Sequence, residues 1–294
     1  MNFNDEPVYV GRDYGGRRLA IDESAVEAYC RAVDHRVPLY EESAPGLVLH
    51  SECYENLDWY LKNIFGNLHA RQEWELFHPV PVGSEVTTRG FIRDRYRKRG
   101  RDYVVKETWI LDGDGLLLSR GLTHQSFLAA EEIGAGRDTD VVSKDREKRG
   151  NRKFEIGGKG GRSLAPMDRH VSEEMCMLFS GPTENYHTNR EQARALGFPD
   201  IVVQGMLPIC FVSELLTREF GLGWLAGGKM DVRLVNVLWA NESVRACAEE
   251  TSESLEAGRT RVHLDVWIEK TDGTRVIVGT ASALREAAAA PDPR

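Results

Sequence analysis

The sequence from residue 205 to residue 221 reads Gly-Met-Leu-Pro-Ile-Cys-Phe-Val-Ser-Glu-Leu-Leu-Thr-Arg-Glu-Phe-Gly. Its apolar side chains recur at helical spacing and form a wide surface, which predicts a long helix from about Gly205 to Phe220. Gly221 suits the position just past a helix C-terminus, where glycine adopts a left-handed backbone at little cost. A helix with so much apolar surface needs a covering layer, and we expect a sheet to supply it.

A second stretch of the same kind lies about 150 residues earlier in the chain, from about Leu47 to Phe65. It too ends in a Phe-Gly dipeptide, at Phe65 and Gly66. The spacing of three and four predicts another long helix, and the residues that carry this spacing are Tyr54, Leu57, Leu61 and Ile64.

Strand patterns follow each of the two helices in the same order, which indicates that one structural plan occurs twice. Two glycine-containing segments, Asp112–Gly115 and Thr271–Gly273, have the composition of tight hairpin turns. A helix followed by an antiparallel meander is an α+β unit, and two copies in one chain form a pseudo-dimer. The predicted strands are Glu73–Val80, Gly83–Val86, Tyr103–Leu111 and Leu116–Phe127 in the first half, and Met230–Val237, Ala240–Val244, Arg261–Glu269 and Val276–Leu284 in the second.

A change of composition separates the two halves. Charged residues crowd together between 144 and 149, and four glycines follow between 157 and 161. We therefore expect an N-terminal domain over residues 1–130, a linker over 131–165 and a C-terminal domain over 166–294.

The overall composition excludes several classes of function. The formal net charge of -8 and the pI near 5.6 argue against nucleic-acid binding. No apolar stretch is long enough to span a membrane, and the N-terminus lacks a secretory signal, so we expect a cytoplasmic protein. No metal-binding or dinucleotide motif occurs, and no cofactor is expected. Five scattered cysteines are expected to be reduced and mostly buried.

The densest polar cluster runs from Phe179 to Asn189 and reads Phe-Ser-Gly-Pro-Thr-Glu-Asn-Tyr-His-Thr-Asn. Gly197-Phe198 and then Gln204-Gly205-Met206 follow it. This arrangement resembles the MaoC-like, or (R)-specific enoyl-CoA hydratase, family, whose signature places a serine, a glycine, an aspartate and a histidine ahead of the central helix. The resemblance implies a double-hotdog fold, in which two helix-wrapping antiparallel sheets form an intrachain pseudo-dimer.

The match to that signature is partial. Ser180, Gly181 and His187 stand where the family has its serine, glycine and catalytic histidine. Pro182 stands where the family has its catalytic aspartate, and Gln204 replaces the usual histidine before the helix. The acid-base pair of the family therefore lacks its carboxylate in this sequence.

The chemistry of the family can be stated from the residues that remain. Adding water to an α,β-unsaturated thioester needs a base that works near neutral pH, and the His187 imidazole is the candidate. The resemblance assigns to the N–H of Gly205 the stabilisation of negative charge on the thioester oxygen, a role that unpaired N–H groups at a helix start can fill.

Four alternatives address the missing carboxylate. Glu184 could act from the same loop, Asp34 could reach across from the first half, or Asn185 or Asn189 could hold the water alone. In the fourth alternative catalysis has been lost.

Further residues are candidates for binding the substrate. The first half carries a degenerate copy of this loop around Asp34 and Tyr40. By resemblance to the family, the first half shapes the acyl pocket. His35 is expected to be a solvated loop residue. The basic run 95–101 is either a solvated hairpin tip or an anchor for the phosphates of coenzyme A or a carrier-protein arm. The full set of binding candidates is Ser180, Gln204, Met206, Asp34, Tyr40, Arg97 and Arg99.

These expectations together predict a lyase that hydrates or dehydrates an acyl thioester carried on coenzyme A or acyl carrier protein. Two rival hypotheses remain, a hotdog thioesterase and a protein that binds acyl thioesters without catalysis. The expected partners are an acyl-thioester substrate and, where acyl carrier protein bears the thioester, that carrier protein. Both a monomer and a homodimer are compatible with an internal pseudo-dimer.

Overall fold

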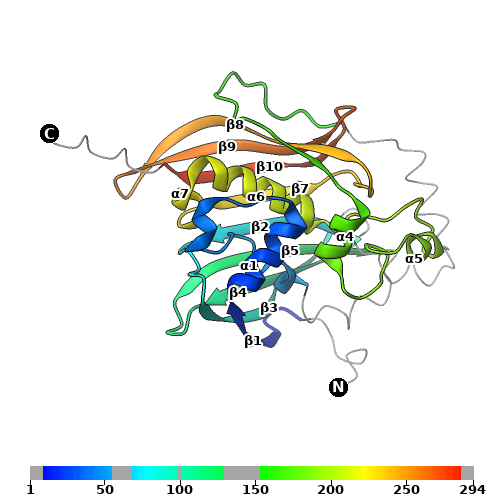
Figure 1. Ribbon diagram of the computed structural model, residues 1–294, viewed down its shortest axis with the longest axis horizontal. Coiled ribbons are helices and arrows are strands. Elements are labelled where there is room, and N and C mark those ends of the chain that lie inside the picture. Colours follow the sequence, from blue (N-terminus) through cyan, green and yellow to red (C-terminus); the bar gives the residue numbers. More distant parts are fainter. Residues whose placement is uncertain (1–8, 55–67, 99–100, 129–152, 286–294) are drawn as a thin grey trace.

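The computed structural model describes residues 9–54, 68–98, 101–128 and 153–285. One large antiparallel sheet curves around the long helix α6 (Met206–Phe220), and shorter helices lie at its open side (Figure 1). The α+β class predicted from the sequence is confirmed.

The first half contributes five strands and one α-helix among the described residues, and the second half contributes five strands and four helices. The first-half elements are β1 (Asp13–Ile21), α1 (Glu23–Val33), the 3-10 helices η2 (Pro38–Glu41) and η3 (His50–Cys53), β2 (Leu68–Leu76), β3 (Ser84–Lys98), β4 (Arg101–Leu111) and β5 (Leu117–Leu128). The second-half elements are β6 (Met167–His170), α4 (Glu173–Ser180), α5 (Arg190–Ala195), α6, α7 (Leu222–Leu225), β7 (Lys229–Leu234), β8 (Ser243–Glu256), β9 (Arg259–Lys270) and β10 (Arg275–Leu284).

The order of strands shows that the two halves share one topology. The sheet runs β1-β3-β4-β5-β2-β7-β10-β9-β8-β6. Outward from the centre, the first half reads β2, β5, β4, β3, β1, and the second half reads β7, β10, β9, β8, β6. Equivalent strands therefore occupy equivalent places, and the antiparallel pair β2 and β7 joins the two halves.

Most of the predicted strands and both predicted turns are present. The turn before β5 is held by the Asp112 side chain, which accepts hydrogen bonds from the N–H groups of Asp114 and Leu116. Gly115 and Gly273 both have positive φ, as tight turns require. The sequence patterns missed β1 and β6, the two edge strands.

The predicted helix over 47–65 is wrong for residues 47–54, which form turns and the 3-10 helix η3; residues 55–65 lie outside the described residues. Tertiary contacts fix this segment. The Nζ of Lys106 donates to the backbone carbonyl of Glu52 at 2.9 Å, which occupies an oxygen that an α-helix would pair with its own N–H. The buried Glu52 carboxylate binds Arg17 and Thr88.

Helix α6 is buried along almost its whole length, and its prediction is confirmed. It carries apolar side chains on every side, because the sheet covers one side and elements of the first half cover the other. Gly221 ends the helix with a φ of 52°, and its N–H donates to the carbonyl of Thr217.

One charged side chain interrupts this apolar surface. Glu214 is fully buried in α6 and contacts three donors from the first half: the Tyr29 hydroxyl at 2.9 Å, the Tyr40 hydroxyl at 2.7 Å and the His35 Nδ1 at 2.7 Å. The expectation that His35 is a solvated loop residue is therefore wrong. Its ring is drawn inward because a buried carboxylate needs hydrogen-bond partners.

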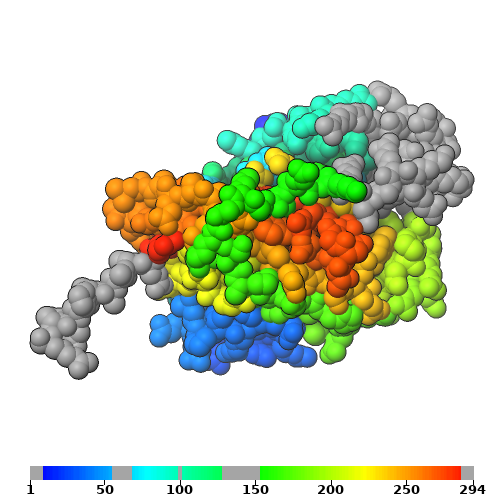
Figure 2. All heavy atoms as spheres, turned by 90° about the horizontal axis from the view of Figure 1, so that it is seen from above, coloured from blue at the N-terminus to red at the C-terminus, as the bar shows by residue number. Residues whose placement is uncertain are grey.

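The segment before β6 crosses the outer surface of the second half and is anchored by hydrogen bonds. The carboxylate of Glu249 in β8 accepts from the N–H groups of Gly158, Lys159 and Gly161. The N–H groups converge because Gly158 and Gly160 adopt positive φ. Figure 2 shows this segment in green, lying over the orange strands.

The contact between Tyr40 and Glu214 predicts a loss of stability in the variant Tyr40→Phe. Removing the hydroxyl takes one partner from a buried carboxylate, and we expect the free energy of unfolding to fall by about 1 to 3 kcal/mol. Urea denaturation followed by circular dichroism measures this change. The exposed Tyr9 provides the control, and Tyr9→Phe should unfold at the wild-type midpoint. Equal midpoints for the two variants would contradict a stabilising role for the contact.

Candidate active site

The loop between α4 and α5 is organised around Asn185. Its side-chain oxygen accepts the N–H of His187 at 2.8 Å, and its Nδ2 donates to the carbonyls of Ser180 and Thr183. The Asn185 N–H in turn donates to the Thr188 hydroxyl. These bonds occupy the Asn185 amide within the loop, so its contribution to the site is to fix the backbone that carries His187.

The ring of His187 is held in one tautomer. Its Nδ1 lies 2.7 Å from the carbonyl oxygen of Val202, and because a carbonyl only accepts, Nδ1 carries the proton and Nε2 keeps a free lone pair. The Tyr186 ring packs against the imidazole with 3.9 Å between centroids. Burial lowers the pKa of His187 to about 4, so the ring is uncharged at neutral pH and Nε2 can accept a proton.

The same hydrogen bond connects His187 to the segment just before α6. Val202 is three residues before Gly205, which is the N-cap of the helix and has no side-chain cap. The N–H of Gly205 donates to no acceptor within the described ranges. The imidazole therefore lies against the segment that leads into the start of α6, which has no side-chain cap.

Neither Glu184 nor Asp34, the two carboxylates considered as partners of His187, contacts its ring in the structure. Glu184 is exposed and accepts a hydrogen bond from Asn189 at 3.1 Å. Asp34 is the exposed C-cap of α1, and its charge acts on Arg169. Within the part of the chain that the structure describes, no carboxylate hydrogen-bonds or ion-pairs with His187.

Residues that the sequence analysis did not select also lie at the start of α6. A Cβ added to Gly205 would lie 3.0 Å from Nδ1 of His69 in β2, so these two residues are in close contact. The His69 ring bonds the Tyr54 hydroxyl at 2.7 Å and the Gln72 side chain at 3.0 Å. No local motif marks these residues, because only the pairing of β2 with β7 brings them to the second half.

The remaining predicted binding residues differ in their surroundings. The Gln204 Oε1 is buried and has no hydrogen-bond partner among the described residues. Met206 is fully buried, and Tyr40 is buried against Glu214. Arg97 is half-exposed in the β3–β4 hairpin with its Nε 3.8 Å from Asp102, whereas Arg99 lies outside the described residues.

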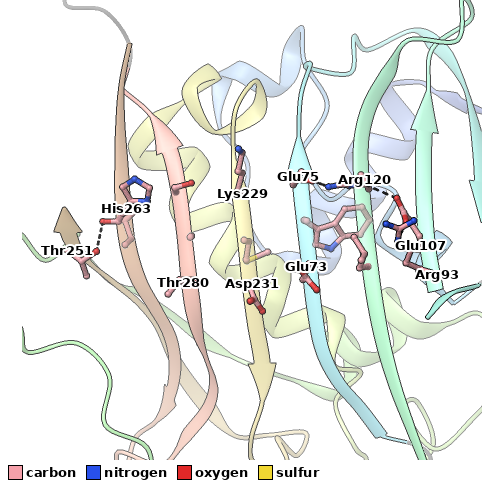
Figure 3. Close-up of a pocket in the computed structure, with 16 residues that line it drawn as sticks. Glu73, Glu75, Arg93, Glu107, Arg120, Lys229, Asp231, Thr251, His263 and Thr280 are labelled. Atoms are coloured by element: carbon pink, nitrogen blue, oxygen red, sulfur yellow. Dashed lines mark hydrogen bonds and ion pairs between the residues drawn. The ribbon is translucent and has the colours of Figure 1, made fainter. Parts of the chain in front are cut away.

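A groove on the outer face of the sheet is separate from these residues. Figure 3 shows charged side chains rising from neighbouring strands, with α6 behind the sheet. The charges largely neutralise one another, since Arg120 pairs with Glu75 and Glu107, and Arg93 pairs with Glu107. The groove is lined by four carboxylates and three cationic side chains, so little net charge remains to select an ionic ligand.

Other kinds of site receive no support from the described residues. They contain no cluster of three or more histidine, cysteine, aspartate or glutamate side chains suited to a metal ion. Among the described helices, none is both long and apolar enough to cross a membrane. All five cysteines are buried and none forms a disulfide.

Comparison with known proteins identifies the fold. No protein-family model matches the sequence, and a search among curated protein sequences finds no match. A solved structure named MaoC-like dehydratase superposes with a TM-score of 0.72 at 16% identity, covering 95% of this chain and 98% of that one. A MaoC-like dehydratase from Phytophthora capsici gives 0.70 at 14% identity, covering 98% and 99%.

A protein from Mycobacterium tuberculosis that is described as having a double hotdog fold gives a TM-score of 0.62 at 16% identity, covering 97% of this chain and 98% of its own. The chain has the double-hotdog fold. In double-hotdog terms, α6 is the central helix of the second hotdog, and β2 and β7 form the seam between the two sheets.

The lowered pKa of His187 predicts the pH dependence of stability. Between pH 6.5 and about 4 the unfolded chain binds a proton that the folded ring does not, so stability falls with falling pH. The slope from one such ring is at most about 1.4 kcal/mol per pH unit. His187→Gln should therefore lose less stability than wild type over this range.

Urea denaturation at a series of pH values measures this difference. The exposed His78 provides the control, since His78→Gln also removes one imidazole but from the surface. Parallel stability curves for wild type and His187→Gln would contradict an uncharged His187 in the folded protein.

Proposed function

We propose that the protein hydrates an α,β-unsaturated acyl thioester, or dehydrates the corresponding 3-hydroxyacyl thioester. The observation that carries the proposal is the His187 imidazole, whose proton lies on Nδ1 and whose Nε2 is a free base beside the segment leading into α6. Similarity in fold to proteins named MaoC-like dehydratases supports this reaction class.

The proposed reaction uses two groups of the second hotdog. The Nε2 of His187 takes a proton from water while the water oxygen bonds to the β-carbon. The electron pair of the carbon-carbon double bond moves toward the thioester, and the Gly205 N–H stabilises the negative charge on its oxygen. The proton on His187 then passes to the α-carbon, which restores the free base.

The β3–β4 hairpin is the proposed anchor for the phosphates of the carrier. The sheet register places Arg95, Val104, Gln125 and His69 in one row across four strands. Arg97 lies two residues farther toward the hairpin tip. Arg95 and Arg97 therefore lie toward the end of the sheet at which His69 meets the start of α6, where a phosphate-bearing arm would enter.

The first test measures turnover of crotonyl-CoA by the full chain. We expect the enoyl absorbance to fall without release of free thiol, and His187→Gln to lower kcat at least about 100-fold because the base is lost. His78→Gln should retain the wild-type kcat. Thiol release without loss of the double bond would instead identify a thioesterase, and binding without either change would identify a non-catalytic acyl-thioester-binding protein.

The second test concerns Gly205. A Cβ at this position would lie 2.5 Å from Leu234 Cδ2 and 3.0 Å from His69 Nδ1, so Gly205→Ala must displace the helix start. We expect kcat to fall about 100-fold or more, as for the loss of one oxyanion donor, while the far-ultraviolet spectrum stays unchanged. A wild-type kcat in Gly205→Ala would exclude this N–H as the oxyanion donor.

The third test separates phosphate binding from chemistry. Arg97→Ala should raise KM for crotonyl-CoA about tenfold, since one charged contact to phosphate is worth about 1.4 kcal/mol, and should leave KM for the N-acetylcysteamine thioester unchanged. Arg18→Ala, which removes an exposed arginine of β1, is the control. An equal change in KM for both thioesters would contradict the phosphate anchor.

A further inference from the structure

We infer that the first half supplies the water-binding group that the second-half loop lacks, and that this group is the hydroxyl oxygen of Tyr54, oriented by His69. The inference rests on the proposed function and names the partner of His187 in that reaction. It is carried by a partly buried hydrogen-bond network that reaches the start of α6 from the first half.

The network fixes the direction of each hydrogen bond. The Gln72 Nε2 donates to the Glu73 carbonyl, so the Gln72 Oε1 is the atom that faces His69 and Thr123. This oxygen accepts from the Thr123 hydroxyl at 2.9 Å and can only accept from His69. His69 therefore carries its proton on Nε2, and its Nδ1 accepts the proton of the Tyr54 hydroxyl at 2.7 Å.

This direction makes the Tyr54 oxygen an acceptor. Because its proton is directed to His69, the oxygen presents lone pairs to any further partner. Burial lowers the pKa of His69 to about 4, which keeps the ring neutral and able to accept at physiological pH. The pair thus offers what a carboxylate offers to water, namely an acceptor, without burying a net charge.

The location of the pair is set by two contacts. His69 touches Gly205, with 3.0 Å from its Nδ1 to the Cβ position of the glycine. The Tyr54 hydroxyl bonds this same nitrogen. The ring of Tyr186 packs on His187, and the hydroxyl of Tyr186 is one of the neighbouring groups that raise the pKa of Tyr54. Tyr54 therefore also interacts electrostatically with the loop that carries His187.

The role in the reaction follows from these positions. The attacking water donates one hydrogen to the Tyr54 oxygen and the other to the Nε2 of His187. His187 takes its proton as the water oxygen bonds to the β-carbon and later returns it to the α-carbon, so the Tyr54 hydroxyl keeps its own proton throughout. Tyr54 is thus a catalytic residue that contacts the water, and His69 is a positioning residue that acts through Tyr54.

Kinetics of crotonyl-CoA hydration test the roles of both residues. We expect Tyr54→Phe to lower kcat about 100-fold with KM changed less than about threefold, because the water loses an acceptor while the thioester keeps its contacts. His69→Leu should be equally impaired. The kcat of His69→Gln should be about tenfold higher than that of His69→Leu, because the amide oxygen can accept the Tyr54 proton.

The fold offers a matched control in the same half. Tyr9 is an exposed tyrosine outside both proposed binding regions. Tyr9→Phe should keep the wild-type kcat. A Tyr54→Phe variant with wild-type kcat, alongside an inactive His187→Gln, would overturn the inference and leave the proposed function standing.

A binding measurement shows whether Tyr54 and His69 lie in the substrate site independently of whether the protein is a hydratase. The full chain is labelled with ¹⁵N-histidine and titrated with butanoyl-CoA, which has no double bond to hydrate, and the variants at 69 and 187 assign the signals. We expect both ring signals to shift at saturation. A shift of His187 alone would overturn the inference. Shifts of both rings in a chain that hydrates no enoyl thioester would refute only the reaction and keep Tyr54 and His69 in the site.

Discussion

The antiparallel pairing of β2 with β7 is the interaction on which the rest of the molecule depends. It joins two five-stranded sheets into one, with Gln72 opposite Val232 and Trp74 opposite Met230. A doubly hydrogen-bonded ion pair, Arg71 to Asp231, crosses the seam at 2.6 Å in both bonds. Such a bidentate contact fixes the register, and a slip by one residue would turn every side chain of β2 to the opposite face.

The register of this seam determines the composition of the candidate site. His69 precedes the paired segment of β2 by two residues, and it reaches Gly205 because β7 and α6 belong to the same half. In the proposed reaction the first half contributes His69 from β2 and Tyr54 from the end of η3. The signature region of the sequence contains His187 and Gly205 but neither of these two residues.

The accuracy of the sequence predictions follows from how local each signal is. Helix α6 was predicted because its apolar pattern and its terminal glycine lie within one stretch of chain. The segment 47–54 was mispredicted because a side chain from another strand, Lys106, takes a backbone carbonyl there. Glu214 gave no signal, since a single acidic residue in an apolar helix does not indicate which donors from the other half will meet it.

The two ends of the pseudo-dimer have diverged in their physical character. Beside Gly46, which immediately precedes the first-half turn segment 47–54, a Cβ would meet Leu76, Trp224 and Leu225. Beside Gly205 the polar neighbour is His69, whose ring hydrogen-bonds the Tyr54 hydroxyl and the Gln72 side chain in a partly buried chain.

Tyr40 and His35 of the first-half loop are committed to Glu214. Water and an activated carbonyl need polar partners in a protected space. The first-half end has apolar side chains beside Gly46, and its loop donors bond a buried carboxylate. At the second-half end, the N–H of Gly205 and the Nε2 of His187 bond no partner among the described residues. One duplicated architecture thus concentrates its capacity for chemistry at a single end.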